Sequence, residues 1–197
     1  MCDLAMSLKN RLVKTNDPNI VVYKDLLQPV DCNEIADYVI QEKINNTEEE
    51  GMPWEKGNSI LLNHIDKKFF DYIIAYRMML NSITSMYFKE IVYPTHSDIV
   101  LWNKGDSMIP HVDDGSRGTA DDVEGLWFRD YSAVTYLNDD FTGGETFVKD
   151  YVNVPKTGSV IIYPSSYEHG VHEVLDGKRV TFAMWFTLNP SKIEKLI

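Results

Sequence analysis

Gly158-Ser-Val-Ile-Ile-Tyr-Pro-Ser-Ser-Tyr-Glu-His169-Gly-Val-His172-Glu-Val-Leu-Asp-Gly177-Lys-Arg179-Val-Thr-Phe-Ala-Met-Trp185-Phe contains two strand patterns separated by turns. Residues 159–163 form a run of β-branched and aromatic side chains, which ends at Pro164 because proline cannot donate to a strand ladder. Residues 180–188 form a second such run after the turn signal Asp-Gly. The pattern therefore predicts two strands, with a histidine between them and Arg179 at the start of the second.

A His-x-Asp pair, His111 and Asp113, lies upstream of these strands. Residues i and i+2 of a strand point to the same face, so both side chains can reach one ion. Two imidazoles and one carboxylate form the ligand set that leaves part of an octahedral iron open for substrate and oxygen. The third ligand is His169 or His172, which stand ten and seven residues before Arg179. Arg179 would then bind an anionic cosubstrate.

The composition is that of one soluble globular domain of 197 residues, with 44% hydrophobic and 25% charged residues. The net charge of −11 argues against a nucleic-acid partner, because such proteins usually carry a basic footprint. The two cysteines, Cys2 and Cys32, favour a reducing compartment over a structural disulfide. The sequence contains neither an apolar run of membrane-spanning length nor a signal-peptide pattern, so we expect a soluble, cytoplasmic protein without membrane contact.

The first half of the chain is predicted to be helical, with one long loop. Helical spacing of apolar residues predicts helices at about 32–44, with Asp31 as the N-cap, and at 66–90. The polar loop at 45–59 contains Gly51, Pro53 and Gly57. It is either a solvated loop or a lid that brings Trp54 over a substrate.

The second half of the chain shows short β-rich runs separated by Gly, Asp-Asp and Pro, the pattern of a sandwich or barrel. The runs lie at residues 98–102, 110–113, 132–137, 145–148, 152–154, 159–163, 171–174 and 180–188. We therefore predict an α+β fold: a single domain with a helical support region at about 18–92 and a double-stranded β-helix, or cupin-like jelly roll, at about 93–190.

The order of these motifs resembles the iron(II)- and 2-oxoglutarate-dependent dioxygenases, in particular their prolyl 4-hydroxylase-like branch. The resemblance covers about residues 99–186. It rests on Trp102-Asn-Lys-Gly105 before Pro110-His111-Val-Asp113, on Tyr136-Leu-Asn138 before Gly143-Gly-Glu-Thr-Phe147, and on His169-Gly-Val before Val174-Leu-Asp-Gly177-Lys-Arg179. In that family the distal histidine stands ten residues before the basic clamp, which favours His169 over His172.

The resemblance implies a ligand set and a cosubstrate site. His111, Asp113 and His169 would hold Fe(II). 2-Oxoglutarate would chelate the iron, and its distal carboxylate would meet Arg179, whose planar fork suits bidentate recognition of a carboxylate. Tyr136 would help to hold that carboxylate. O2 would complete the reactants, 2-oxoglutarate would be decarboxylated to succinate and CO2, and a substrate carbon would be hydroxylated; ascorbate is a possible accessory.

The sequence departs from the family pattern near the cosubstrate. Trp102 and Met108 replace tyrosines, so hydrogen bonds around 2-oxoglutarate are expected to differ. Trp185 would wall the pocket, and Arg129 matches a position that contacts substrate in some relatives. Trp127, in the insertion at 115–130, and Trp54 are further candidates for a substrate wall.

Three functions remain open from the sequence. The first is the hydroxylation of a prolyl residue in a peptide or protein by a dioxygenase. The second is hydroxylation of a free amino acid or small metabolite by the same class of enzyme. The third is a non-catalytic jelly-roll module that binds a metal or a partner, which would have no need of Arg179 and Tyr136 beside the ligands. The substrate and the oligomeric state are not encoded in any motif.

Overall fold

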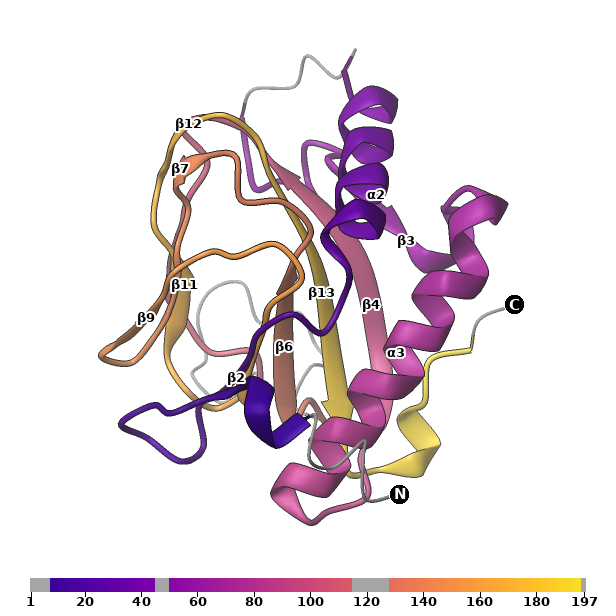
Figure 1. The fold of residues 1–197 in the computed structure, drawn as a ribbon, viewed down its shortest axis with the longest axis vertical. Coiled ribbons are helices and arrows are strands. Elements are labelled where there is room, and N and C mark those ends of the chain that lie inside the picture. Colours follow the sequence, from indigo (N-terminus) through magenta and orange to yellow (C-terminus); the bar gives the residue numbers. More distant parts are fainter. Residues whose placement is uncertain (1–7, 45–49, 115–127, 196–197) are drawn as a thin grey trace.

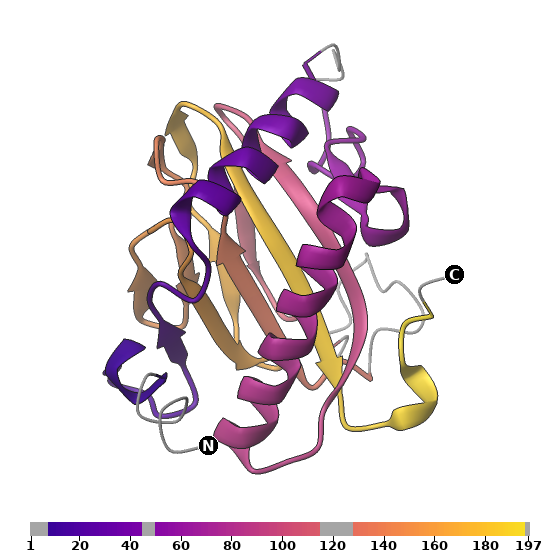
Figure 2. The same cartoon turned by 45° about the vertical axis from the view of Figure 1, so that its right-hand side comes forward.

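A computed structural model of the chain describes residues 8–44, 50–114 and 128–195. Within this part of the chain, helices α2 (Pro29–Glu42) and α3 (Lys67–Phe88) cover one face of a large antiparallel sheet. A smaller sheet faces the opposite side of the large one (Figure 1). Figure 2 shows the two helices lying side by side across the large sheet.

The described strands form three sheets, and every pair is antiparallel. The seven-stranded sheet has, in spatial order, β1 (Leu12–Val13), β2 (Val21–Tyr23), β10 (Val160–Pro164), β6 (Tyr131–Tyr136), β13 (Arg179–Thr187), β4 (Tyr93–Trp102) and β3 (Ser59–Leu61). The four-stranded sheet has β5 (Met108–His111), β11 (His169–Val171), β8 (Thr146–Val148) and β9 (Tyr151–Asn153). A two-stranded ribbon joins β12 (Val174–Asp176) to β7 (Thr142–Gly143). Two short 3-10 turns, η1 (Leu62–His64) and η2 (Pro190–Lys192), lie outside the sheets.

Strand β13 shows how the sheet separates the core from the site. Its residues Val180, Phe182, Met184 and Phe186 are buried against the helices. The alternate residues point to the other face because successive side chains of a strand lie on opposite sides. Arg179 and Trp185 are on this second face, between the two sheets. The apolar core beneath the helices therefore holds β13 in place, and the opposite face of β13 carries the site residues.

The helices begin and end close to the predicted positions, with one correction. Asp66 caps α3, accepting a hydrogen bond from the backbone N–H of Lys68 at 2.8 Å. The prediction that Asp31 caps the first helix is wrong. That helix begins earlier, with Gln28 at the N-cap position and Pro29 in the first turn, where a missing N–H has no cost. Asp31 lies inside the first turn, where a negative charge is favourable.

The predicted fold class, a double-stranded β-helix supported by N-terminal helices, is confirmed by the strand arrangement and by the solved structures with the same fold. The predicted strand at 171–174 is wrong. The strand is interrupted at His172 and Glu173. Before the interruption β11 pairs with β5 and β8, and after it β12 pairs with β7, so the two segments belong to different sheets.

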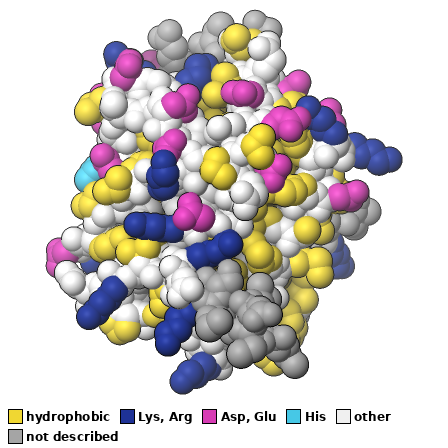
Figure 3. Space-filling model, viewed as in Figure 1, with side chains coloured by type: hydrophobic (Ala, Val, Ile, Leu, Met, Phe, Trp, Pro, Cys, Tyr) yellow, Lys and Arg dark blue, Asp and Glu magenta, His cyan; other side chains and the backbone are white. Residues whose placement is uncertain are grey.

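The surface carries charges of both signs. Figure 3 shows Lys and Arg side chains mixed with Asp, Glu and apolar side chains on one face of the molecule. The net charge of −11 is therefore not expressed as a uniformly acidic surface on this face. Among the described residues no helix has both the length and the apolar character needed to cross a bilayer.

Candidate active site

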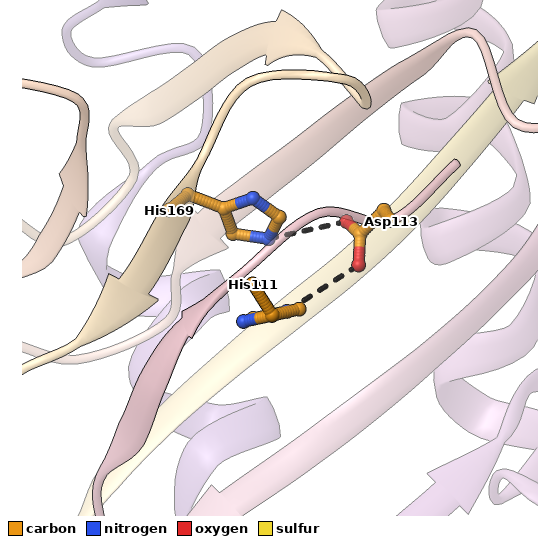
Figure 4. Close-up of side chains that lie close together, drawn as sticks. All are labelled: His111, Asp113 and His169. Atoms are coloured by element: carbon orange, nitrogen blue, oxygen red, sulfur yellow. Dashed lines mark ion pairs between the residues drawn. The ribbon is translucent and has the colours of Figure 1, made fainter. Parts of the chain in front are cut away.

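Three side chains from the predicted ligand set converge between the sheets (Figure 4). The Nε2 atom of His169 lies 3.3 Å from Oδ2 of Asp113, and the Nε2 atom of His111 lies 3.5 Å from Oδ1 of the same carboxylate. One ligand atom from each residue lies within 4.8 Å of the other two. This spacing lets the three atoms contact a single cation.

Strand pairing positions the three side chains. His111 ends β5 and stands directly opposite His169, the first residue of β11. Asp113 lies just past β5, and its backbone N–H donates to the carbonyl of Ser165 at 2.8 Å. Residues 58 apart in the chain are thus neighbours, because they share one antiparallel register.

Both imidazoles are oriented by a contact between Nδ1 and the backbone carbonyl two residues earlier. Nδ1 of His111 lies 3.0 Å from the carbonyl oxygen of Ile109, and Nδ1 of His169 lies 2.9 Å from that of Tyr167. A carbonyl oxygen only accepts hydrogen bonds, so each Nδ1 carries a proton and each Nε2 is the nitrogen that faces the carboxylate of Asp113. Metal-binding histidines are commonly fixed in this way. The donor set of two imidazole nitrogens and one carboxylate is the one that mononuclear non-haem iron takes.

Asp113 is held by two further donors. Its Oδ2 accepts hydrogen bonds from Oγ of Ser132 at 2.7 Å and from Nε1 of Trp185 at 2.8 Å. Burial acts to raise the pKa of Asp113, but the charge of His169 and the hydrogen bonds outweigh it, and the pKa lies well below its usual value. Burial likewise acts to lower the pKa of His111, yet the contact with Asp113 raises it overall. The carboxylate is therefore available as an anionic ligand.

The structure places His172 outside this cluster. Its side chain is 49% exposed, its Nδ1 lies 3.3 Å from Oε2 of Glu145, and its ring stacks on Phe147. His172 is therefore a surface residue that directly follows β11, and its contacts are with Glu145 and Phe147.

Arg179 is a buried guanidinium without a carboxylate partner. Its exposed fraction is 1%, and no carboxylate of the described residues lies within the 4.0 Å ion-pair distance. Burial lowers its pKa below the usual value. Its Nε has no hydrogen-bond partner in the part of the chain that the structure describes, and the same holds for Nε1 of Trp102, whose ring centroid lies 4.9 Å from the guanidinium carbon. Two unpaired donors and an unpaired positive charge fit the carboxylate of an anionic cosubstrate.

Thr146 links the guanidinium to Tyr136. Its Oγ1 accepts from Nη2 of Arg179 at 3.0 Å and from the phenol of Tyr136 at 2.9 Å. The phenol in turn accepts the backbone N–H of Thr146 at 3.0 Å. A hydroxyl has two lone pairs, so its own O–H remains free to donate to a bound anion. Sequence reasoning did not select Thr146 as a site residue, although its place in Gly143-Gly-Glu-Thr-Phe147 could have indicated it.

The remaining predicted residues are placed as follows. Trp185 lies against Asp113, and the guanidinium carbon of Arg129 lies 4.2 Å from the centroid of its ring. Trp54 is 44% exposed and packs edge-on against Trp102, with ring centroids 6.4 Å apart. Trp127 and residues 45–49 of the predicted lid lie outside the described residues.

Sequence comparison identifies both a family and individual relatives. Residues 92–187 match the model of the 2OG-Fe(II) oxygenase superfamily. Human prolyl 3-hydroxylase 2 is 47% identical over 73 residues, which covers 32% of this chain and 10% of that protein. Rat prolyl 3-hydroxylase 1 is 42% identical over 77 residues, covering 34% of this chain and 11% of that protein. The chain thus spans only about a tenth of the length of these relatives.

Solved structures extend the similarity to most of the chain. A Trichoplax adhaerens prolyl hydroxylase, in complex with a hypoxia inducible factor peptide fragment, has a TM-score of 0.66 at 14% identity, and covers 96% of this chain and 91% of its own. A Pseudomonas putida prolyl-4-hydroxylase has a TM-score of 0.60 at 18% identity, and covers 86% of this chain and 92% of its own. At these identities the likeness is one of fold. The match to the 2OG-Fe(II) oxygenase superfamily covers residues 92–187, just under half of the chain, and the solved structures show that the same fold extends over most of it.

Proposed function

We propose that the chain is an Fe(II)- and 2-oxoglutarate-dependent dioxygenase that hydroxylates a prolyl residue in a peptide or protein, with decarboxylation of 2-oxoglutarate to succinate and CO2. The observation that carries the proposal is the meeting of His111, Asp113 and His169, in a chain that also buries Arg179 without a carboxylate partner among the described residues. A barrel that only binds a metal would have no use for an unpaired guanidinium, which is costly to bury.

In this proposal His111, Asp113 and His169 hold Fe(II). The metal, when bound, supplies the chemistry that activates O2 and oxidises the substrate carbon. The carbonyls of Ile109 and Tyr167 hold the proton at Nδ1 of each histidine, so that Nε2 would be the nitrogen that gives up its proton when the metal binds. Ser132 and Trp185 hold the carboxylate of Asp113 in place. These contacts fix the ligand atoms before the metal arrives.

The cosubstrate carboxylate would bind at Arg179, with Trp102 and Thr146 as additional donors. Nε1 of Trp102 has no other partner, and it stands where many family members have a tyrosine hydroxyl. Tyr136 contributes indirectly, because its phenol donates to Thr146 and so orients that hydroxyl. Trp102 would therefore donate to the cosubstrate through its indole N–H where the family pattern has a tyrosine hydroxyl.

The substrate would lie against Trp185 and Arg129, on the side of the metal ligands. Trp54 packs on Trp102 and would cover the cosubstrate end instead. A peptide or protein substrate is supported by the relatives, which are named as prolyl hydroxylases. We further propose ascorbate as an accessory reductant, and a cytoplasmic location, which the buried free thiol of Cys32 supports.

The test is a two-stage measurement on the purified chain. An anaerobic titration with Fe(II) and 2-oxoglutarate is followed by its charge-transfer absorption, and O2 is then admitted with a panel of proline-rich peptides and free proline. Mass spectrometry is expected to show succinate and a peptide product heavier by one oxygen atom. Hydroxylation of free proline alone would assign the chain to small-molecule oxygenases.

Alanine variants of two proposed ligands and of His172 test the ligand set. His111→Ala and Asp113→Ala are expected to abolish formation of succinate, because each removes one of only three protein ligands. His172→Ala is the control and is expected to retain it, since this side chain is half exposed and contacts Glu145. Normal succinate formation in Asp113→Ala would refute the assigned ligand set.

A further inference from the structure

Asp98 is a buried carboxylate that the reaction scheme above does not use. It lies in β4 with 6% of its surface exposed. Within the described ranges, its Oδ1 has no hydrogen-bond partner. An unpaired carboxylate oxygen in a protein interior is unfavourable unless a ligand or another group later supplies a donor.

The strand register places Asp98 on the face of the large sheet that looks toward the metal ligands. Val100 and Trp102 follow it at two-residue steps and line the interior between the sheets. Asp98 stands opposite Ala183 of β13. Ala183 is two residues before Trp185, whose indole N–H reaches Asp113. Asp98 therefore lies near the middle of β4, four residues before the cosubstrate donor Trp102, on the strand next to the one that carries Trp185.

The basic side chains near Asp98 in the described part of the chain do not satisfy it. Nε2 of His96 lies 3.8 Å from Oδ2, beyond hydrogen-bond distance. Arg129 lies over Trp185, and its Nε also has no hydrogen-bond partner among the residues that the structure describes. Burial lowers the pKa of Arg129, while the charges of Asp113 and Asp98 oppose this effect, so the groups share one electrostatic environment. Even so, no carboxylate of the described residues lies within 4.0 Å of the Arg129 guanidinium.

The other face of the same strand shows a satisfied arrangement of the same kind. Arg77 of α3 is also buried, yet its Nη2 lies 2.7 Å from Oε2 of Glu194 and its Nε donates to Ser97 at 3.2 Å. Where a buried charge serves only the fold, the chain supplies its partner. Asp98, the residue after Ser97, lacks such a partner on the face that looks toward the site.

We propose that Asp98 is a specificity-determining residue, which accepts a hydrogen bond from a cationic group of the substrate next to the target carbon. The inference rests on the proposed function and adds the chemistry of the substrate. A cation fits better than a neutral donor because it supplies both the missing hydrogen bond and a compensating charge. The net charge of −11 also favours the approach of cationic peptides. The group can be a lysine or arginine side chain or a free amino end.

The test compares three peptides that share one proline. The first is capped at both ends and has lysine next to the proline; the second has norleucine in place of the lysine. The third has norleucine and a free amino end next to the proline. Equilibrium binding is measured with 2-oxoglutarate and Mn(II) in place of Fe(II), so that the readout does not depend on turnover. The wild-type protein and Asp98→Asn are compared, because asparagine keeps the shape and removes the charge.

The wild-type protein is expected to bind at least one cationic peptide about tenfold or more tighter than the capped norleucine peptide, the range for a hydrogen bond between charged groups. Asp98→Asn is expected to reduce this ratio to about one. Preference for the lysine peptide assigns the cation to a side chain, and preference for the third peptide assigns it to an amino end. The comparison within the wild-type protein does not depend on the folding of any variant.

Two outcomes overturn the inference: wild-type protein that treats all three peptides alike, including failure to bind any of them, and a preference that survives in Asp98→Asn. The proposed function fails separately. If the cationic preference depends on Asp98 but no peptide gains an oxygen with Fe(II) and O2, the substrate chemistry stands and prolyl hydroxylation is wrong.

Discussion

Replacing Arg179 with methionine is expected to stabilise the protein when 2-oxoglutarate is absent and to abolish the response to 2-oxoglutarate. The guanidinium is 1% exposed and has no carboxylate partner among the described residues. Exchanging buried ionic groups for apolar ones of similar size is neutral or stabilising by about 1–4 kcal/mol. The lost hydrogen bond to Thr146, at 3.0 Å, offsets about 1 kcal/mol of this. The net gain is therefore up to about 3 kcal/mol.

Thermal unfolding measures both effects. For a chain of this size, 1 kcal/mol shifts Tm by roughly 2–4 °C, so Arg179→Met is expected to melt up to about 10 °C higher than wild type. 2-Oxoglutarate at about 100 times its Kd, with a divalent metal present, stabilises the wild-type protein by about 2.7 kcal/mol, or roughly 5–10 °C. The variant is expected to show no such shift.

Arg77→Met is the matched control, because Arg77 is also buried but is paired with Glu194 at 2.7 Å. Its loss leaves that carboxylate without its partner, so the variant is expected to melt lower than wild type while keeping the full shift with 2-oxoglutarate. A lower Tm for Arg179→Met than for wild type without 2-oxoglutarate, or an undiminished shift with it, would refute the argument that the site is held open at a cost in stability.

Three further predictions concern single positions. Thr146→Val is expected to weaken 2-oxoglutarate binding by roughly tenfold to a hundredfold with little change in metal affinity, because Arg179 loses the hydroxyl that accepts its hydrogen bond. Thr146→Ser keeps a hydroxyl there and should restore binding in the same titration. Gly170→Ala is expected to weaken metal binding, because the new Cβ would lie 2.6 Å from the carbonyl oxygen of Met108 and push β11 from β5; an unchanged metal Kd would contradict this. Cys32 is expected to resist alkylation at pH 9 in the folded protein, because burial raises its thiol pKa to about 12. The unfolded chain loses that proton near the ordinary value of 9.0, so stability falls as pH rises from about 9 toward 12, which denaturant titrations at several pH values would measure.

Much of the fold could be predicted because its signals are local. The run at 180–188 alternates between the helix-covered core and the interior, and the structure has a strand at Arg179–Thr187. The start of α2 was misplaced, since both Pro29 and Asp31 are typical of a first turn and only the backbone decides between them. The break after Val171 could not be read from the sequence, because it depends on which strands β11 and β12 pair with.

The site divides in the same way. The spacing of His111 and Asp113 is a local pattern, and the family's ten-residue spacing pointed to the histidine that the structure brings beside them. The bond from Trp185 to Asp113 joins residues far apart in the chain, so alternation alone indicated a wall and not a hydrogen bond. Asp98 could have been found by counting back from Trp102 in steps of two. It was missed because no motif contains it.

Strand β5 is an edge of the smaller sheet, and among the described strands it pairs only with β11. That pairing is irregular after the His111–His169 contact. A cation held by both imidazoles would cross-link β5 to β11 and so stabilise the pairing of this edge strand. Metal binding and the ordering of β5 would then be coupled. Without the metal, β5 would separate from β11 more readily and leave the edge of the smaller sheet open to other molecules.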